Sequence, residues 1–144
     1  MVKELKTQAI LASIIIYLLS STVWAKDNLT VEVMVRSEKG SVFCNIFSSS
    51  DGFPSKDAKA VARTSAKISK GKAFCKFPDI AAGDYAVVTY HDEDNNGKLN
   101  KNFLGIPSEG LGVSNDEPSR PPKFDKAKFH YDGGKKNIKI NIKY

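Results

Sequence analysis

The sequence predicts an all-β protein, an antiparallel seven-stranded β-sandwich with one long Gly/Pro-rich loop. Three observations support this fold class. Apolar and polar residues alternate with period two in several short runs, turn sequences rich in Gly, Pro and Asp separate the runs, and no segment has the pattern of a long amphipathic helix. The 144 residues are 41% hydrophobic and 26% charged, which is typical of a globular protein.

The first two runs, 29–36 and 41–47, predict a β-hairpin. In the first, Val31 and Val33 alternate with Glu32 and Met34, and Gly40 provides a turn before the second. The next run, 58–68, is rich in Ala and Lys and is compatible with a weak helix or an edge strand. We interpret it as an edge strand because its apolar residues form no helical stripe.

Four further strands complete the predicted sandwich. They are 72–77, 85–90, 124–131 and 137–143, and the last two flank the turn Asp132-Gly133-Gly134. Seven short strands in about 115 residues indicate a sandwich of the immunoglobulin or transthyretin type. The exception to the even spacing is the segment between Tyr90 and Lys123, which contains four glycines and four prolines and shows no strand-like run. Loops of this length in compact domains are usually either functional or disordered.

The N-terminus has the pattern of a secretory signal peptide. Lys3 and Lys6 precede an apolar stretch at 9–19. Val23 and Ala25 are small residues at the −3 and −1 positions of a cleavage site. We therefore expect residues 1–25 to be cleaved, and residues 26–144 to form a single periplasmic or secreted domain without a transmembrane helix. The alternative is an uncleaved anchor, for which the apolar stretch is shorter than the roughly 20 residues that span a bilayer.

The two cysteines, Cys44 and Cys75, both fall in the predicted exported part, where an oxidising compartment favours a disulfide. Strand parity places Cys44 on the same face as Val42 and Ile46, and Cys75 on the same face as Ala73 and Phe77. Both thiols should therefore face the core. Parity does not give distance, so two buried free thiols are the alternative.

The basic composition does not by itself predict a nucleic-acid partner. The chain has 22 Lys and Arg against 16 Asp and Glu, a net charge of +6, but the lysines alternate with apolar residues as they do on solvated strand faces. We expect no exposed aromatic residues to be interleaved with them, as a stacking platform requires. Electrostatic adhesion to envelope polyanions is the alternative partner hypothesis. Against this background, the segment 84–117 contains seven acids and only two bases, Lys98 and Lys101.

The start of the long loop matches part of a calcium-binding loop, D-x-[DN]-x-[DN]-G. Its candidate metal ligands, at loop positions 1, 3, 5, 7 and 9, are Asp92, Asp94, Asn96, Lys98 through its backbone carbonyl, and Asn100. Gly97 permits the sharp turn at position 6. At position 12 Phe103 stands where such loops have a bidentate Glu, so Glu109 or Asp116 would have to complete the shell. The alternative is a turn in which Asx side chains bond to their own backbone without metal.

A longer set of residues resembles a known family. Its segments are Gly83-Asp84-Tyr85-Ala86-Val87-Val88, His91 to Leu99, Gly105 to Asn115, and Pro121-Pro122-Lys123-Phe124. Together they resemble the bacterial domain of unknown function 2141, over nearly all of the predicted mature chain. The resemblance implies a small exported β-protein with no established activity. This chain departs from the family pattern at Asn100, where Asp is commoner, and at Val113, where an aromatic residue is commoner.

From these residues we predict a non-enzymatic binding or structural module whose ligand is unknown or is an envelope component, with a calcium site in the 91–117 loop. The rival hypothesis is an envelope hydrolase that uses His91 and loop carboxylates. Residue types are its only support, because no framed catalytic motif such as G-x-S-x-G or H-E-x-x-H is present.

Overall fold

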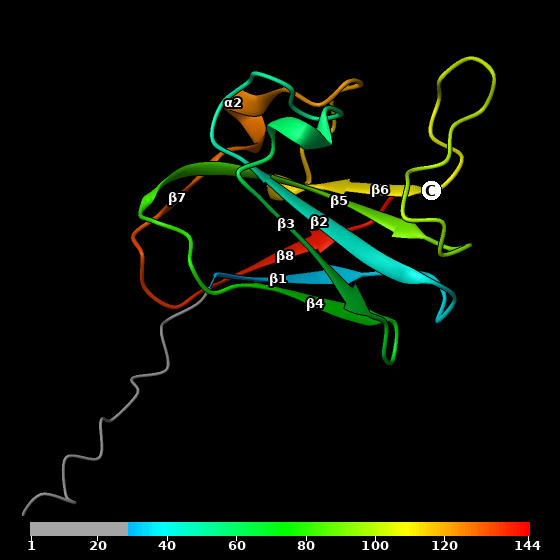
Figure 1. Ribbon diagram of the computed structural model, residues 1–144, viewed down its shortest axis with the longest axis horizontal. Coiled ribbons are helices and arrows are strands. Elements are labelled where there is room, and N and C mark those ends of the chain that lie inside the picture. Colours follow the sequence, from blue (N-terminus) through cyan, green and yellow to red (C-terminus); the bar gives the residue numbers. More distant parts are fainter. Residues whose placement is uncertain (1–28) are drawn as a thin grey trace, which may run out of the picture.

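The computed structural model describes residues 29–144, which form two β-sheets (Figure 1). The predicted signal peptide, residues 1–25, lies outside the described residues. The all-β class is confirmed, but the described part of the chain has eight strands rather than seven, and one of the sheets is mixed.

The smaller sheet has the order β4-β1-β8. Its central strand β1 (Leu29–Met34) pairs antiparallel with β4 (Lys72–Phe77) and parallel with β8 (Lys136–Asn141). The prediction of a purely antiparallel sandwich was therefore wrong. The two parallel strands begin at the same end of the sheet, with Leu29 opposite Lys136, because the chain enters β8 from a turn at that end.

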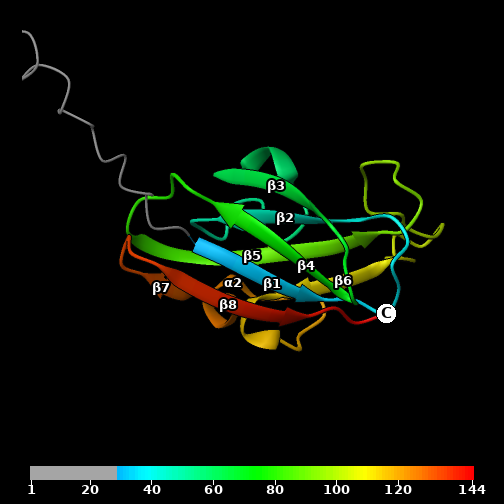
Figure 2. The same cartoon turned by 90° about the horizontal axis from the view of Figure 1, so that it is seen from below.

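The larger sheet is antiparallel and is built around β5. In the order β3-β2-β5-β6 it contains β3 (Ala62–Lys67), β2 (Ser41–Phe47), β5 (Gly83–Asp92) and β6 (Gly110–Val113). β7 (Phe129–Tyr131) pairs with the first residues of β5. Figure 2 shows the smaller sheet lying against the larger one. Of the edge strand predicted at 58–68, residues 62–67 form the edge strand β3, whereas residues 58–59 lie in the 3-10 turn η2 (Asp57–Lys59).

The predicted hairpin between the first two strands was wrong. β1 and β2 belong to different sheets, because both hydrogen-bonding edges of β1 are already taken by β4 and β8. After β1 the chain crosses to the other sheet, where Ser41 lies opposite Asp92 of β5. Alternation of apolar residues specifies which face of a strand is buried and leaves its neighbour open.

Two further corrections concern the second half of the chain. β6 lies inside the loop predicted to have no strand; with glycines at 110 and 112 it presents little side-chain alternation. A Cβ added to Gly112 would lie 2.7 Å from Cγ2 of Ile140, so glycine allows the close approach to β8. The predicted strand at 124–131 is divided into the single-turn helix α2 (Phe124–Ala127) and β7. In α2, Ala127 is buried, and Phe124 packs against Ala86 and Val113 on the larger sheet.

The core lies between the two sheets and contains the predicted disulfide. Cys44 of β2 and Cys75 of β4 are bonded, with Cα atoms 6.4 Å apart and both side chains fully buried. The bridge therefore joins the larger sheet to the smaller one. Over residues 29–144, no helix is both long and apolar enough to cross a membrane.

Reduction of this disulfide should destabilise the fold by about 3–4 kcal/mol, because the bridge closes a loop of 31 residues and limits the unfolded chain. Urea unfolding with and without reductant measures the difference. Cys44→Ala/Cys75→Ala should match the reduced protein and should not respond to reductant. An unchanged unfolding midpoint after complete reduction would contradict this expectation.

Glu32 on β1 should make the stability of the fold depend on pH. Its Oε1 accepts a hydrogen bond from Lys72 Nζ at 2.8 Å, which holds the pKa of the Glu32 carboxyl below the ordinary value of 4.5. The unfolded chain thus binds the proton more tightly. The stabilisation is present above about pH 4.5 and is lost as the pH falls through the lower folded-state pKa.

We therefore expect Glu32→Gln to flatten the acid limb of a plot of unfolding free energy against pH. Lys72→Met should flatten it as well, because the Lys72 hydrogen bond is the main cause of the lowered pKa, and the double variant should behave like Glu32→Gln alone. Urea unfolding between about pH 3 and pH 6 measures the slopes. Equal slopes in the wild type and both single variants would show that the pair makes no contribution.

Candidate functional site

The acidic loop begins at the last residue of β5, Asp92, whose side chain is fully buried. Its Oδ1 accepts the Asn96 N–H at 3.1 Å, and its Oδ2 accepts the Gly97 N–H at 2.7 Å. Gly97 has a φ of 76°, which allows the chain to turn back around this carboxylate. Asp92 thus sits at the centre of a tight loop, at the position that the sequence predicted as the first ligand.

The next predicted ligands contact one another directly. Asp94 Oδ2 accepts a hydrogen bond from Asn100 Nδ2 at 2.8 Å and one from Asn96 Nδ2 at 3.1 Å. The Asn100 hydrogen bond is the main cause of a pKa for the Asp94 carboxyl below its ordinary value, and the Asn96 backbone N–H adds to it. Asp94 is therefore held in the charged form that a cation requires. Asp94 Oδ1 also accepts the Asn96 N–H at 3.2 Å, which is an Asx turn of the metal-free alternative.

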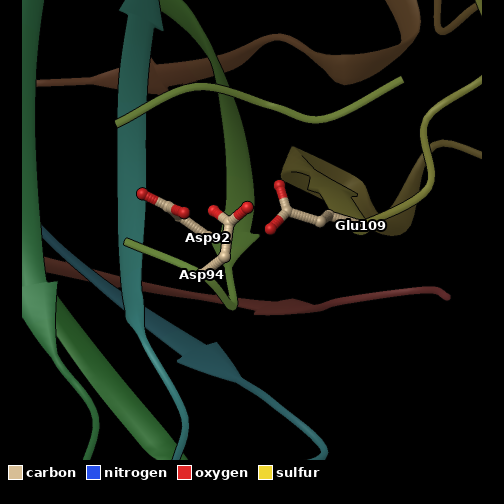
Figure 3. A group of neighbouring side chains, drawn as sticks. All are labelled: Asp92, Asp94 and Glu109. Carbon is tan, nitrogen blue, oxygen red and sulfur yellow. The ribbon is translucent and has the colours of Figure 1, made fainter. Parts of the chain in front are cut away.

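A third carboxylate reaches the loop from the other end of the long connection. Glu109, immediately before β6, is buried, with 8% of its surface exposed. Its Oε1 accepts the Glu93 N–H at 2.9 Å and its Oε2 accepts the Asn100 N–H at 3.0 Å. One oxygen from each of Asp92, Asp94 and Glu109 lies within 4.8 Å of the others, and Figure 3 shows the three side chains converging.

The other acids of the segment 84–117 have partners elsewhere. Glu93 is paired with Arg36 at 3.0 Å, and Asp84 contacts His130 at 2.8 Å. Asp116 accepts hydrogen bonds from Asn141, and Glu117 accepts the backbone N–H groups of Ser119 and Lys123.

Only neutral donors contact the three converging carboxylates in the described part of the chain: Asp92, Asp94 and Glu109. Their mutual repulsion therefore remains without a positive charge against it.

His91 lies next to Asp92 but points to the opposite face of β5 and is fully buried. Its Nε2 is 2.6 Å from the Lys39 carbonyl, which can only accept, so Nε2 carries the proton. Its Nδ1 is hydrogen-bonded to the Tyr144 hydroxyl at 2.6 Å. Both ring nitrogens are thus used to hold the C-terminal residue and the turn at Lys39.

Of the loop carboxylates in the hydrolase hypothesis, Glu93 approaches His91, with its Oε1 3.9 Å from Nδ1, but this carboxylate pairs with Arg36. Ser114 is buried at the far end of β6, where its Oγ accepts the Val87 N–H and donates to the Ala127 carbonyl. Asp92 and Glu109 belong to the carboxylate cluster. Neither Ser114 nor the carboxylate cluster forms a hydrogen bond with His91 in the described part of the chain.

A pocket of about 800 Å³ lies beside the acidic loop on the outer face of the larger sheet, and sequence reasoning missed it. Lys98, predicted to offer its backbone carbonyl to the metal, is among the residues that line it. The available signal was the run 85–90, which is apolar on both strand faces and so indicates that both faces are covered. The pocket is lined by Asn45, Pro54, Ser55, Asp57, Val88, Tyr90, Lys98, Leu99, Lys101, Gly105, Ile106, Pro107, Leu111, Arg120, Pro121 and Pro122.

By its architecture the chain is a small two-sheet β protein with an acidic loop at the end of its central strand. A family model described as an uncharacterised protein conserved in bacteria (DUF2141) matches residues 31–139, which is more than half of the chain. The chain belongs to this family, as the resemblance predicted. No curated protein and no solved structure matches it.

The position of the acidic loop should depend on Gly40. This residue has a φ of 73°, and an added Cβ would collide with the backbone carbonyl of Asp92. Gly97 also has a positive φ, but nothing lies within 4 Å of its added Cβ. We expect Gly97→Ala to cost about 1 kcal/mol of unfolding free energy, and Gly40→Ala to cost clearly more.

Chemical unfolding of the two variants in the presence of a chelator measures these costs. Because both positions bear the same left-handed backbone, the difference between them isolates the contact with Asp92. Equal losses would mean that the backbone of Asp92 moves freely and that Gly40 does not position the loop.

Proposed function

We propose that this protein is an exported binding module without enzymatic activity, and that its 91–117 loop binds a calcium ion. The convergence of Asp92, Asp94 and Glu109, with neutral donors alone around them, is the observation that carries the proposal. A divalent cation would remove the repulsion between the three carboxylates.

The hydrogen bonds within the loop are compatible with metal binding. A carboxylate oxygen has two lone pairs, and each oxygen of Asp92 and Glu109 uses one of them for a backbone N–H. The second lone pair of each remains for a cation. Calcium takes six to eight oxygen ligands, so we expect the Lys98 carbonyl and the side-chain oxygens of Asn96 and Asn100 to contribute.

Glu109 would supply the ligand that a Glu at position 12 supplies in a continuous calcium loop. Phe103, which stands at position 12, is 95% exposed and offers no oxygen from its side chain. Glu109 brings two oxygens and a charge from the opposite end of the connection. A site assembled from two segments in this way should have the modest affinity of extracellular calcium modules, roughly 10⁻⁴–10⁻³ M.

Export is supported by the disulfide, since such bonds persist in oxidising compartments, and by the signal-peptide pattern at 1–25. A role in binding rather than catalysis is supported by His91, whose two ring nitrogens are buried and already bonded. A panel of ester, glycoside and peptide substrates tests this part of the proposal. Turnover that is lost in His91→Ala, with an unchanged melting temperature, would overturn it.

We expect calcium to raise the melting temperature of the purified protein. At tenfold excess over the dissociation constant, one bound ion stabilises the folded state by about 1.4 kcal/mol. Asp94→Asn and Glu109→Gln should abolish the shift, because each removes a charge and keeps the side-chain shape. Thermal melts at about 10 mM calcium, magnesium or chelator measure it.

Glu117→Gln is the matched control for this experiment. Glu117 is a buried acid of the same segment, but its oxygens accept the N–H groups of Ser119 and Lys123, away from the cluster. This variant should keep the full calcium shift. No shift in the wild type, or an equal shift in Asp94→Asn, would rule out the calcium site.

A further inference from the structure

The pocket beside the acidic loop has an apolar floor made by the larger sheet. Val88 and Tyr90 occupy successive outward positions on β5, and Leu111 lies opposite Tyr90 on β6. The Tyr90 ring stacks on Phe43 of β2, with the ring centres 5.1 Å apart and the planes 7° apart. The floor is therefore held in place by sheet hydrogen bonds and by ring packing.

The walls come from three segments that are distant in the sequence. One wall is the 98–107 loop with Ile106 and Pro107, and the others contain Pro54 and the pair Pro121-Pro122. In Figure 1 the 98–107 loop projects beyond the ends of β5 and β6. The volume of about 800 Å³ is within the range of roughly 300–1,000 Å³ that is typical of small-molecule sites.

The charges around the pocket are unbalanced. Lys98, Lys101 and Arg120 line it, and none of the three has an ion-pair partner among residues 29–144. Its one carboxylate, Asp57, is already occupied: it pairs with Arg63 at 3.0 Å and accepts from Asn45 Nδ2 at 2.9 Å. The pocket therefore combines an apolar floor with an excess of positive charge.

We propose that this pocket binds a small amphipathic anion, whose apolar body lies on Val88, Tyr90 and Leu111 and whose acidic group lies among Lys98, Lys101 and Arg120. Apolar lining with a few charged groups is the usual composition of such sites. The proposal does not depend on calcium, since none of the three converging carboxylates lines the pocket.

Linear carboxylates are suitable probes because their chain length varies at constant charge. An alcohol with the same chain length lacks the charge. Protein purified after expression of the full chain is titrated by calorimetry with hexanoate, octanoate and decanoate below their micelle concentrations. A chelator is present throughout, so the result of this titration does not depend on whether the calcium proposal is correct. We expect each added CH₂ to tighten binding by up to about fourfold, and 1-octanol to bind more weakly than octanoate.

Two pairs of variants separate the apolar and the charged contributions. Lys101→Glu/Arg120→Glu should weaken octanoate by at least about fivefold and leave 1-octanol unchanged. Lys76→Glu/Lys135→Glu, which makes the same charge change on exposed lysines away from the pocket, should have little effect. Ile106→Ser should weaken decanoate, whereas Phe74→Ser, an exposed apolar residue on β4, should not.

These exposed positions should tolerate substitution, and circular dichroism checks that each variant is folded. Absence of binding by all three carboxylates would overturn the proposal. So would equal binding of octanoate and 1-octanol, or equal losses in the pocket variants and their controls. Binding to anionic vesicles without binding of monomeric carboxylates would also overturn it and would point to the exposed tip at Phe103 and Leu104, which are 95% and 68% exposed.

Discussion

The burial of both faces of β5 is the constraint on which the rest of the structure depends. Residues 85–92 of this strand are all buried, although successive side chains point alternately to the inner and the outer face of the larger sheet. Its inner face, with Tyr85 and Val87, packs in the core between the sheets, and its outer face carries Val88 and Tyr90 into the pocket. Asp92, the last outward residue, begins the acidic loop. Core, pocket and carboxylate cluster are thus successive parts of one strand.

The end of β5 is fixed from both sides, which explains how a polar loop can be well positioned. On the inner face His91 is bonded to Lys39 and Tyr144, and Arg36 lies over the Tyr144 ring at 3.9 Å while it pairs with Glu93. On the outer face Glu109 accepts backbone N–H groups from both ends of the loop. These contacts bring the three carboxylates together in the folded chain, so little further ordering would be needed for the cation proposed above.

Most strands could be predicted from the sequence because period-two alternation reports which residues face the core, and Cys44 and Cys75 were placed correctly for this reason. The hairpin was wrong because alternation does not identify a strand's neighbour. β6 was missed because two of its four residues are glycines. Asp92 and Asp94 follow a local pattern, so their place in the acidic loop could be predicted, and their role as metal ligands stays a prediction. The pocket could not be predicted, because Tyr90 and Pro122 meet only through the tertiary fold.

The parallel pairing of β1 with β8 has a consequence for the timing of folding. Val31 lies opposite Ile138, more than a hundred residues later in the chain, so the smaller sheet is completed only after β8 is available. Contacts between residues so distant in sequence slow folding, since the intervening loop must be closed first. The same pairing that closes the sheet therefore leaves one hydrogen-bonding edge of β1 without a partner until the last strand has been made.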